Sequence, residues 1–226
     1  MKNIIWNEEI AKDTASVLIG SGVYSIDFKK NKDEWTKLPD GTITPCYCNC
    51  RYINRSPFQT RVIVNYLETI TRLKFKNAEI VVGLATAGIP FASLLADRLN
   101  LPVSYVRSKP KGYGQGNLVE CNPQRGLKAL VIDDLLFTGS SLMRAVEALS
   151  SEYGIETVGL ATIVSLSSWE SKENEWKFFK DRNVPLCSLT SYSHLLEELL
   201  SKEKITKEEL KELNFYYLSP KTYEWK

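Results

Sequence analysis

An acidic pair followed by a hydroxyl-rich turn is the clearest sign of chemistry in this sequence. Asp133 and Asp134 come directly after the apolar run 129–132, and the turn 138–141, Thr-Gly-Ser-Ser, opens a segment with helical spacing. Backbone N–H groups at such a helix start bind anions, so the turn is suited to a phosphate group. Carboxylates beside it accept hydrogen bonds from sugar hydroxyls or hold a hydrated Mg²⁺. The two features together predict a site for a phosphorylated sugar.

A simpler interpretation of the acidic pair needs no ligand. A buried strand that ends in an Asp cap before an ordinary helix would carry the same residues. A nucleoside triphosphatase is disfavoured, because the turn 138–141 lacks the lysine and the glycine spacing of a P-loop. From the pair and the turn alone, a ligand site and a structural cap therefore both stay open.

Two further stretches have residue types that suit a polyanion. The small residues of 83–90, GLATAGIP, allow the backbone to approach a ligand closely. In 106–118, VRSKPKGYGQGNL, three glycines and a proline prevent regular structure, and Arg107, Lys109 and Lys111 supply positive charge. Such a loop is predicted to close over a polyanion. A tight strand-to-helix turn and a solvated basic loop are the alternatives.

The elements that must position these stretches alternate between strands and helices. Short apolar runs predict strands at 79–85, 103–108, 128–134, 157–166 and 184–190. Helical spacing and capping residues predict helices from Ser56-Pro57 onward and at 88–99, after the turn 138–141, and at 169–182, 192–200 and 206–213. This alternation is typical of an α/β fold with a doubly wound, mainly parallel sheet. Ligands bind such sheets beyond the carboxyl ends of the strands, where the three stretches are predicted to lie.

The N-terminal quarter has a different pattern. A helix is predicted from Asn7, its cap, to about Leu18, and strands are predicted at 23–28 and 42–53 with a turn at 39–41 between them. We therefore expect a small helix-and-strand unit in residues 1–55, beside an α/β core in residues 56–226.

Composition excludes several classes of protein. The 226 residues, 43% hydrophobic and 25% charged, have ordinary globular values, and the net charge of +2 gives no reason to expect a nucleic-acid or membrane partner. No apolar run approaches the length of a membrane span. Acidic residues occupy the N-terminal region where a signal peptide would be apolar, so a cytoplasmic location is predicted.

Cysteine and histidine offer little for catalysis. The five cysteines, an odd number, fit reduced thiols, and Cys46, Cys48 and Cys50 are predicted to share one face of a strand. No second group of ligands accompanies them, so a thiol-lined face is favoured over a zinc site. His194, the only histidine, is predicted to be a surface or capping residue at a helix start. A mechanism built on a nucleophile and a histidine is therefore disfavoured.

The run VIDDLLFTGSSL, residues 131–142, resembles the binding motif for 5-phosphoribosyl 1-pyrophosphate (PRPP) of the type I phosphoribosyltransferases. Together with 83–90 and 106–118, in this order, it resembles the orotate phosphoribosyltransferase family over most of residues 80–145. More weakly, DGTITPCYCNCR, residues 40–51, resembles the strand of that family's hood over the base.

The resemblance implies a type I phosphoribosyltransferase fold, in which residues 1–55 form a hood over the base site. It implies transfer of the phosphoribosyl group of PRPP to orotate, which gives orotidine 5′-monophosphate and pyrophosphate. It also implies Mg²⁺ as cofactor, carried mainly by PRPP and water, with Asp133 and Asp134 as the nearest protein donors. The partners implied are these small molecules and a second copy of the chain, a homodimer in which the loop 107–117 reaches the neighbouring site.

The resemblance also assigns roles to residues. Those implied to be catalytic are Lys111, Tyr113, Asp133 and Asp134. Those implied to bind PRPP are Thr86, Ala87, Gly88, Arg107, Lys109, Lys111, Tyr113, Asp133, Asp134, Leu135, Leu136, Phe137, Thr138, Gly139, Ser140 and Ser141. Those implied to contact the base are Tyr47, Cys48 and Phe137. Within the set, 86–88 are assigned to the pyrophosphate, the acidic pair to the ribose hydroxyls and 138–141 to the 5′-phosphate.

The sequence departs from the family mainly on the side of the base. Tyr113 stands at the family's loop histidine, Pro39 at its hood lysine, and Phe137 at a Ser or Thr that faces the base; Ser167 or Ser168 stands where some members have an arginine. The residues for PRPP are largely kept. Two alternatives to orotate phosphoribosyltransferase therefore stay open: a phosphoribosyltransferase for a different nucleobase, and a PRPP-binding paralog with weak or no activity.

Overall fold

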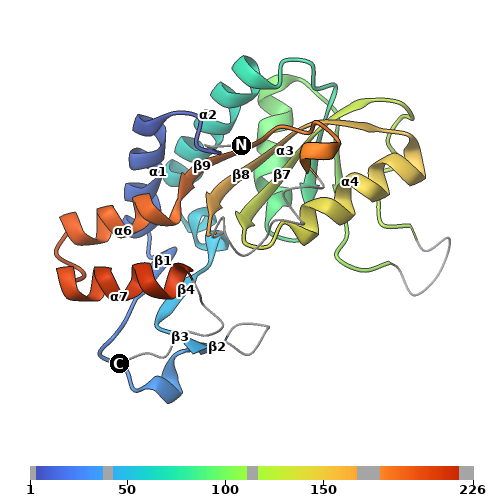
Figure 1. Ribbon diagram of the computed structural model, residues 1–226. Helices are drawn as coiled ribbons and strands as arrows, with labels where there is room; N and C mark the ends of the chain where they lie inside the picture. Colours follow the sequence, from blue (N-terminus) through green and yellow to red (C-terminus); the bar gives the residue numbers. More distant parts are fainter. Residues whose placement is uncertain (1–3, 38–42, 111–116, 167–178, 219–226) are drawn as a thin grey trace.

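A five-stranded parallel sheet forms the centre of the molecule (Figure 1). The computed structural model describes residues 4–37, 43–110, 117–166 and 179–218. The strand order is β6-β5-β7-β8-β9, and all four pairings are parallel. The strands are β5 (Ile80–Leu84), β6 (Val103–Val106), β7 (Lys128–Leu136), β8 (Glu156–Ser165) and β9 (Leu186–Ser191). This confirms the predicted doubly wound α/β fold.

Helices cover both faces of the sheet. They are α1 (Glu8–Gly20), α2 (Pro57–Lys74), α3 (Gly88–Leu99), α4 (Ser140–Tyr153), α6 (Tyr192–Ser201) and α7 (Lys207–Leu218). In β7, Leu130 and Ile132 join the hydrophobic cluster that contains residues of α1, α2, α3 and α6. The alternate residues Ala129 and Val131 join a second cluster, with α4. All four side chains are fully buried, which explains the continuous apolar run of this strand.

Local signals set the ends of several helices. Asn7 caps α1 by accepting a hydrogen bond from the N–H of Ile10 at 2.9 Å. Ser56 caps α2 and Pro57 occupies its first turn, as predicted. The other predicted strands and helices in the described part of the core also form, with ends shifted by a few residues. The predicted helix at 169–182 lies mostly outside the described residues.

We call the short strands β1 to β4, with the 3₁₀ helices η1 (Lys32–Glu34) and η2 (Cys50–Arg55), the hood. β1 (Tyr24–Ile26) pairs antiparallel with β4 (Cys46–Cys48), and β2 (Thr36–Lys37) pairs antiparallel with β3 (Ile43–Thr44). In Figure 1 the hood lies beyond one end of the central sheet. The predicted turn at 39–41 lies outside the described residues.

The prediction of one strand over 42–53 is wrong, because β3 and β4 are separate strands on either side of Pro45 and no strand continues beyond Cys48. The chain turns into η2, so Cys50 leaves the strand face that Cys46 and Cys48 share. Cys50 and Ile53, three residues apart, are 1% and 0% exposed. Burial of these two side chains at helical spacing therefore outweighs the alternating pattern of the sequence. The Cys50 thiol donates a hydrogen bond to the backbone carbonyl of Asp134 at 3.7 Å, which links the hood to β7.

α1 packs against the core. The hydroxyl of Thr190, in β9, donates to the carbonyl of Ala11 at 2.8 Å. His194, in the first turn of α6, contacts Ser191 through Nδ1 at 2.7 Å and Glu8 through Nε2 at 2.9 Å. It thus ties α6 to α1. The domain boundary at residue 55 stays a prediction.

No helix in the described ranges combines the length and the apolar character needed to cross a membrane.

Candidate active site

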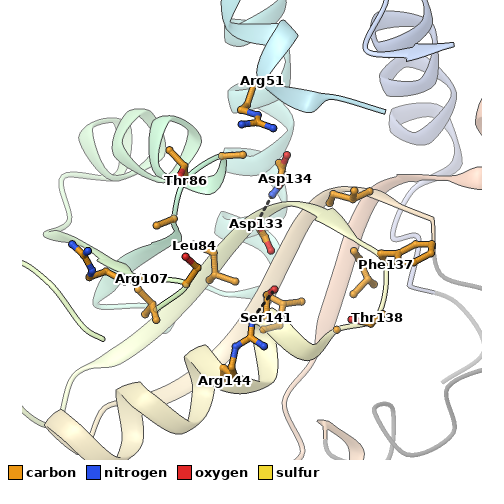
Figure 2. Close-up of a pocket in the computed structure, with 18 of the residues that line it drawn as sticks. Arg51, Leu84, Thr86, Arg107, Asp133, Asp134, Phe137, Thr138, Ser141 and Arg144 are labelled. Atoms are coloured by element: carbon orange, nitrogen blue, oxygen red, sulfur yellow. Dashed lines mark hydrogen bonds between the residues drawn. The ribbon is translucent and has the colours of Figure 1, made fainter. Parts of the chain in front are cut away.

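A pocket of about 420 Å³ opens where β5, β6 and β7 end (Figure 2). Loops that follow these strands form most of its wall, and the hood contributes the rest. Its lining residues are Cys48, Asn49, Arg51, Leu84, Ala85, Thr86, Ala87, Val106, Arg107, Ser108, Asp133, Asp134, Leu135, Leu136, Phe137, Thr138, Gly139, Ser141, Leu142 and Arg144. The three stretches that the sequence singled out therefore meet in one place.

The acidic pair lies inside β7, two residues before its end rather than at it. β7 pairs with β5 as far as Ile132, and then continues along β8 as far as Leu136. Because β5 stops at Leu84, Asp133 and Asp134 border open space on that side and line the pocket (Figure 2). The pairing with β8 holds their backbone in place.

Burial disfavours ionisation of the acidic pair. Burial, and the neighbouring carboxylate of Asp134, raise the pKa of Asp133 from 3.8 to about 8. Burial also raises the pKa of Asp134, although the positive charge of Arg51 opposes this rise. The N–H of Asp134 donates to the Asp133 carboxylate at 2.9 Å. A cation or hydrogen-bond donors brought into the pocket by a ligand would favour the doubly ionised pair.

The turn 138–141 begins α4 and has the form of an anion site. Gly139 has φ +83°, a conformation in which a side chain would be strained, and it precedes the first residue of α4. The hydroxyls of Thr138 and Ser140 lie 2.8 Å apart. Arg144, one helical turn later, donates to the hydroxyl of Ser141 at 3.4 Å. The positive end of a 14-residue helix, hydroxyls and a guanidinium therefore converge on this side of the pocket.

The turn between β5 and α3 supplies backbone and small side chains. Thr86 and Ala87 line the pocket, and the peptide bond between Ala85 and Thr86 is cis. Gly88 does not line it, but a Cβ there would come within 2.5 Å of the carbonyl oxygen of Ile132. The missing side chain therefore lets α3 begin directly against β7, beside the acidic pair.

The stem of the loop after β6 is held at both ends. The N–H of Arg107 donates to the carbonyl of Leu118 at 3.0 Å. The carboxylate of Glu152, near the end of α4, accepts the N–H groups of Leu118 and Val119 at 2.9 and 3.0 Å. The Arg107 guanidinium lines the pocket and forms an ion pair with Glu120 at 3.4 Å. The loop thus leaves and returns at fixed points.

The hood covers the acidic pair from the other side. Cys48, Asn49 and Arg51 line the pocket. Tyr47 does not; its side chain is exposed, and its hydroxyl accepts a hydrogen bond from the Asn49 amide at 3.1 Å. Phe137 lines the pocket directly before the turn 138–141 and is 36% exposed.

Residues 58–186, which contain most of this pocket, match the family model of the phosphoribosyl transferase domain. The chain belongs to the phosphoribosyltransferase family. Orotate phosphoribosyltransferase of Bacillus subtilis (strain 168) is 37% identical to it over 185 residues, which cover 82% of this chain and 83% of the relative. Orotate phosphoribosyltransferase of Bacillus mycoides (strain KBAB4) is 36% identical over 214 residues, which cover 95% and 98%.

Solved structures agree. The crystal structure of orotate phosphoribosyltransferase from Aeropyrum pernix superposes with a TM-score of 0.67 at 26% identity, and the match covers 83% of this chain and 98% of that one. The predicted phosphoribosyltransferase fold and the resemblance to the orotate phosphoribosyltransferase family are confirmed.

Most residues predicted to bind PRPP lie in the phosphoribosyltransferase pocket. Those that line it are Thr86, Ala87, Arg107, Asp133, Asp134, Leu135, Leu136, Phe137, Thr138, Gly139 and Ser141. Gly88, Lys109 and Ser140 belong to the same turns and loop stem but are not among the lining residues. Lys111 and Tyr113 lie outside the described residues. The roles of all these residues stay predictions.

Four polar residues of the phosphoribosyltransferase pocket were not among the predicted site residues: Asn49, Arg51, Ser108 and Arg144, of which Ser108 lies in the predicted basic loop. Arg144 had a usable signal, because it lies three residues after Ser141 in a predicted helix and therefore on the same helix face. No local pattern of the sequence indicated that Asn49 and Arg51 line the pocket. Their positions depend on the turn from β4 into η2, which the alternating pattern concealed.

Proposed function

We propose that the protein is an orotate phosphoribosyltransferase of de novo pyrimidine synthesis, which converts orotate and PRPP to orotidine 5′-monophosphate and pyrophosphate. The observation that carries the proposal is the pocket in which the acidic pair, the turn 138–141 and the turn 85–88 meet. These groups suit the ribose, the 5′-phosphate and the pyrophosphate of one PRPP molecule. Orotate is supported by the relatives at 36% and 37% identity.

The reaction requires stabilisation of a departing anion. The bond between C1 of the ribose and the pyrophosphate oxygen breaks, and its electron pair stays on that oxygen. The lone pair of orotate N1 forms the new bond to C1, and the N1 proton is released. As the bond to pyrophosphate weakens, positive charge develops on the ribose and negative charge on the pyrophosphate. Fixed donors and cations aimed at the leaving oxygens are therefore the main source of rate enhancement.

In this proposal each wall of the pocket has one task. Asp133 and Asp134 accept hydrogen bonds from the ribose hydroxyls, and the turn 138–141 with Arg144 holds the 5′-phosphate. Arg107 contacts the pyrophosphate from the stem of the loop. Binding of the two phosphate ends fixes C1 between them, so that the base is presented to a defined position.

Mg²⁺ fits the donor set of this pocket. No cluster of three or more histidine, cysteine or carboxylate ligands occurs among the residues that the structure describes, so the protein alone does not enclose an ion there. Asp133 and Asp134 offer carboxylate oxygens, directly or through water, and the hydroxyls and phosphates of PRPP would complete the oxygen coordination that Mg²⁺ prefers. When bound, the ion would offset negative charge on the pyrophosphate.

The direct test is the loss of orotate absorbance on mixing the protein with orotate, PRPP and Mg²⁺, with formation of pyrophosphate measured in parallel. We expect turnover that depends on each of the three. A protein that binds PRPP but does not consume orotate would refute the proposal.

A different nucleobase is the second candidate, and Phe137 is the observation that favours it. Its aromatic ring lines the pocket where the family has a hydroxyl that faces the base. A panel of purines and pyrimidines, with release of pyrophosphate from PRPP as the readout, separates the candidates. Orotate should give the highest kcat/KM; a higher value for another base would assign the second function, and no release with any base would indicate a PRPP-binding paralog.

We further propose a homodimer in which the loop 107–117 reaches the neighbouring site. The cytoplasmic location stays a prediction. Two single variants, Lys111→Ala in the loop and Asp134→Asn in the acidic pair, should each be nearly inactive. Mixed together under conditions that exchange subunits, they should recover activity, because one site of each mixed dimer then has both groups intact. Mixed subunits without recovery would place both residues in one subunit's site.

A further inference from the structure

The pyrophosphate side of the pocket lacks a positive charge on its own turn. The turn 85–88 is Ala-Thr-Ala-Gly, although pyrophosphate is the most highly charged part of PRPP. In the part of the chain that the structure describes, three arginines line the pocket: Arg51, Arg107 and Arg144. Arg144 is bonded to Ser141 on the 5′-phosphate side, and Arg107 is paired with Glu120. Arg51 is the third of these arginines, and it comes from η2 of the hood.

The side chain of Arg51 is held by a chain of hydrogen bonds within the hood. Its Nε donates to the side-chain oxygen of Asn49 at 3.1 Å, and the Asn49 amide donates to the Tyr47 hydroxyl at 3.1 Å. That hydroxyl lies 3.4 Å from the hydroxyl of Tyr52. The two terminal guanidinium nitrogens have no hydrogen bond or ion pair to any other described residue. They are therefore oriented but available to a ligand.

The position of Arg51 selects which part of the substrate it would meet. Figure 2 shows the guanidinium above Asp134, on the side of the pocket where Thr86 lies and away from Phe137. The charge of Arg51 acts on the Asp134 carboxylate, which agrees with their closeness in this view. With the ribose hydroxyls on the acidic pair and the 5′-phosphate on the turn 138–141, the pyrophosphate on C1 extends toward Thr86.

We propose that Arg51 is a further pyrophosphate-binding residue, which supplies from the hood the cation that the turn 85–88 lacks. The inference rests on PRPP as the substrate. A planar guanidinium donates two parallel hydrogen bonds to phosphate oxygens, which gives it both strength and direction. Its effect grows as charge accumulates on the leaving pyrophosphate, so it contributes to catalysis as well as to binding. Asn49, which holds Nε, is then a positioning residue.

The test compares Arg51→Gln with a matched control, Arg61→Gln, whose exposed side chain lies on α2 outside the pocket. Calorimetry with Mg²⁺ measures the affinity for pyrophosphate and, separately, for ribose 5-phosphate. We expect Arg51→Gln to weaken pyrophosphate binding by about tenfold or more, as for a lost charge-assisted hydrogen bond, and to leave ribose 5-phosphate binding within about twofold. Arg61→Gln should change neither.

Kinetics supply the second readout. Arg51→Gln should raise KM for PRPP and lower kcat, while KM for orotate stays near the wild-type value. Because Arg51 is exposed, the thermal unfolding midpoint should not change. Unchanged pyrophosphate affinity, or a loss confined to orotate, would overturn the inference; the latter would place Arg51 at the base. The calorimetry needs no base, so a wild-type protein that fails to consume orotate would refute the proposed function and still leave this inference decided.

A double-mutant cycle tests the role of Asn49. Asn49→Ala should weaken pyrophosphate binding by less than Arg51→Gln does, because the guanidinium is misplaced rather than removed. In the Arg51→Gln background the same change should have no further effect on pyrophosphate. Additive losses would show that Asn49 acts independently of Arg51 and would remove it from the proposal.

Discussion

One half of the pocket is formed by the loops that follow β5, β6 and β7. The backbone of a five-stranded sheet sets the position of each residue in this half. We call this the strand-end half. The hood half, residues 46–53, rests instead on a two-stranded sheet, a 3₁₀ helix and side chains that bond to one another, such as Arg51 to Asn49. In the proposed function, the strand-end half is the rigid frame for the phosphate groups and the ribose. The hood half can change its contacts without disturbing the fold.

Packing accounts for this difference. β7 is buried on both faces between two hydrophobic clusters, so displacement of its end would disturb the whole core. The hood half is attached to the core by fewer groups, chiefly Cys50 and Ile53, while Tyr47 and Arg51 are exposed. Substitutions in the strand-end half should therefore affect stability and PRPP binding together, whereas those at exposed positions of the hood half, such as Arg51, should affect ligand binding alone.

The largest expected effect comes from Gly88→Ala. The added Cβ would meet the carbonyl oxygen of Ile132 at 2.5 Å, and neither backbone can move without distorting the start of α3 or the acidic pair. We expect a loss of about 2–3 kcal/mol in the free energy of unfolding, measured in urea, and little remaining activity. Gly20→Ala is the control, because nothing lies within 4 Å of its added Cβ. Equal stability of the two variants would contradict the rigidity of the strand-end half.

Asp133→Asn should abolish most activity while it stabilises the free protein. We expect kcat/KM for PRPP to fall by about a hundredfold or more, since the carboxylate proposed to bind the ribose hydroxyls is lost. Burial and Asp134 raise the pKa of Asp133 to about 8, so between about pH 4 and pH 8 the unfolded chain releases a proton that the folded chain keeps. The free energy of unfolding of the wild type therefore falls as pH rises through this window.

The amide introduced by Asp133→Asn cannot titrate, and the variant should lack this pH dependence. Its stability relative to wild type should rise by roughly 1–3 kcal/mol from pH 4 to pH 8. Urea unfolding at the two pH values measures the difference. If the difference in the free energy of unfolding between the variant and the wild type is the same at both pH values, the acidic pair is already ionised in the free protein. Burial of the pair would then not destabilise the strand-end half before ligand binds.

The same division explains what the sequence could predict. The strand-end half was recognisable because its signals are local: an apolar run, an acidic pair and a Thr-Gly-Ser-Ser turn follow one another in the chain. α3 was predicted at 88–99 and forms over Gly88–Leu99. Even here β7 was predicted two residues too short, as 128–134, because pairing with β8 keeps Leu135 and Leu136 in the strand and the sequence of β7 does not contain that register.

The hood half could not be predicted because its structure depends on distant contacts. Tyr47 was assigned to the base, which stays a prediction; the hydrogen bonds that join its hydroxyl through Asn49 to Arg51 could not be foreseen from the sequence. η2 forms because Cys50 and Ile53 reach the core and because the Cys50 thiol meets the carbonyl of Asp134, 84 residues away. No pattern within 42–53 records that contact.

Glu152→Gln tests whether the strand-end half extends to the loop. The Glu152 carboxylate accepts two backbone N–H groups, from Leu118 and Val119, where the loop returns to the core. Gln has a single acceptor oxygen and no charge, so one N–H loses its partner. We expect kcat/KM for PRPP to fall by about tenfold, with a smaller change for orotate. Glu147→Gln, an exposed change on the same helix, should leave both constants unaltered.

Phe137→Ala should have the smallest effect, and one confined to the base. Phe137 belongs to the strand-end half by its place in the chain, but its side chain is 36% exposed and lines the pocket rather than the core, so unfolding should be nearly unchanged. Loss of this aromatic surface at the proposed base site should raise KM for orotate by about three- to tenfold. Steady-state kinetics with each substrate varied in turn measures this, and KM for PRPP should stay constant. If KM for PRPP rises instead, Phe137 supports the turn 138–141. Its side chain then belongs, like its backbone, to the strand-end half and not to the base site.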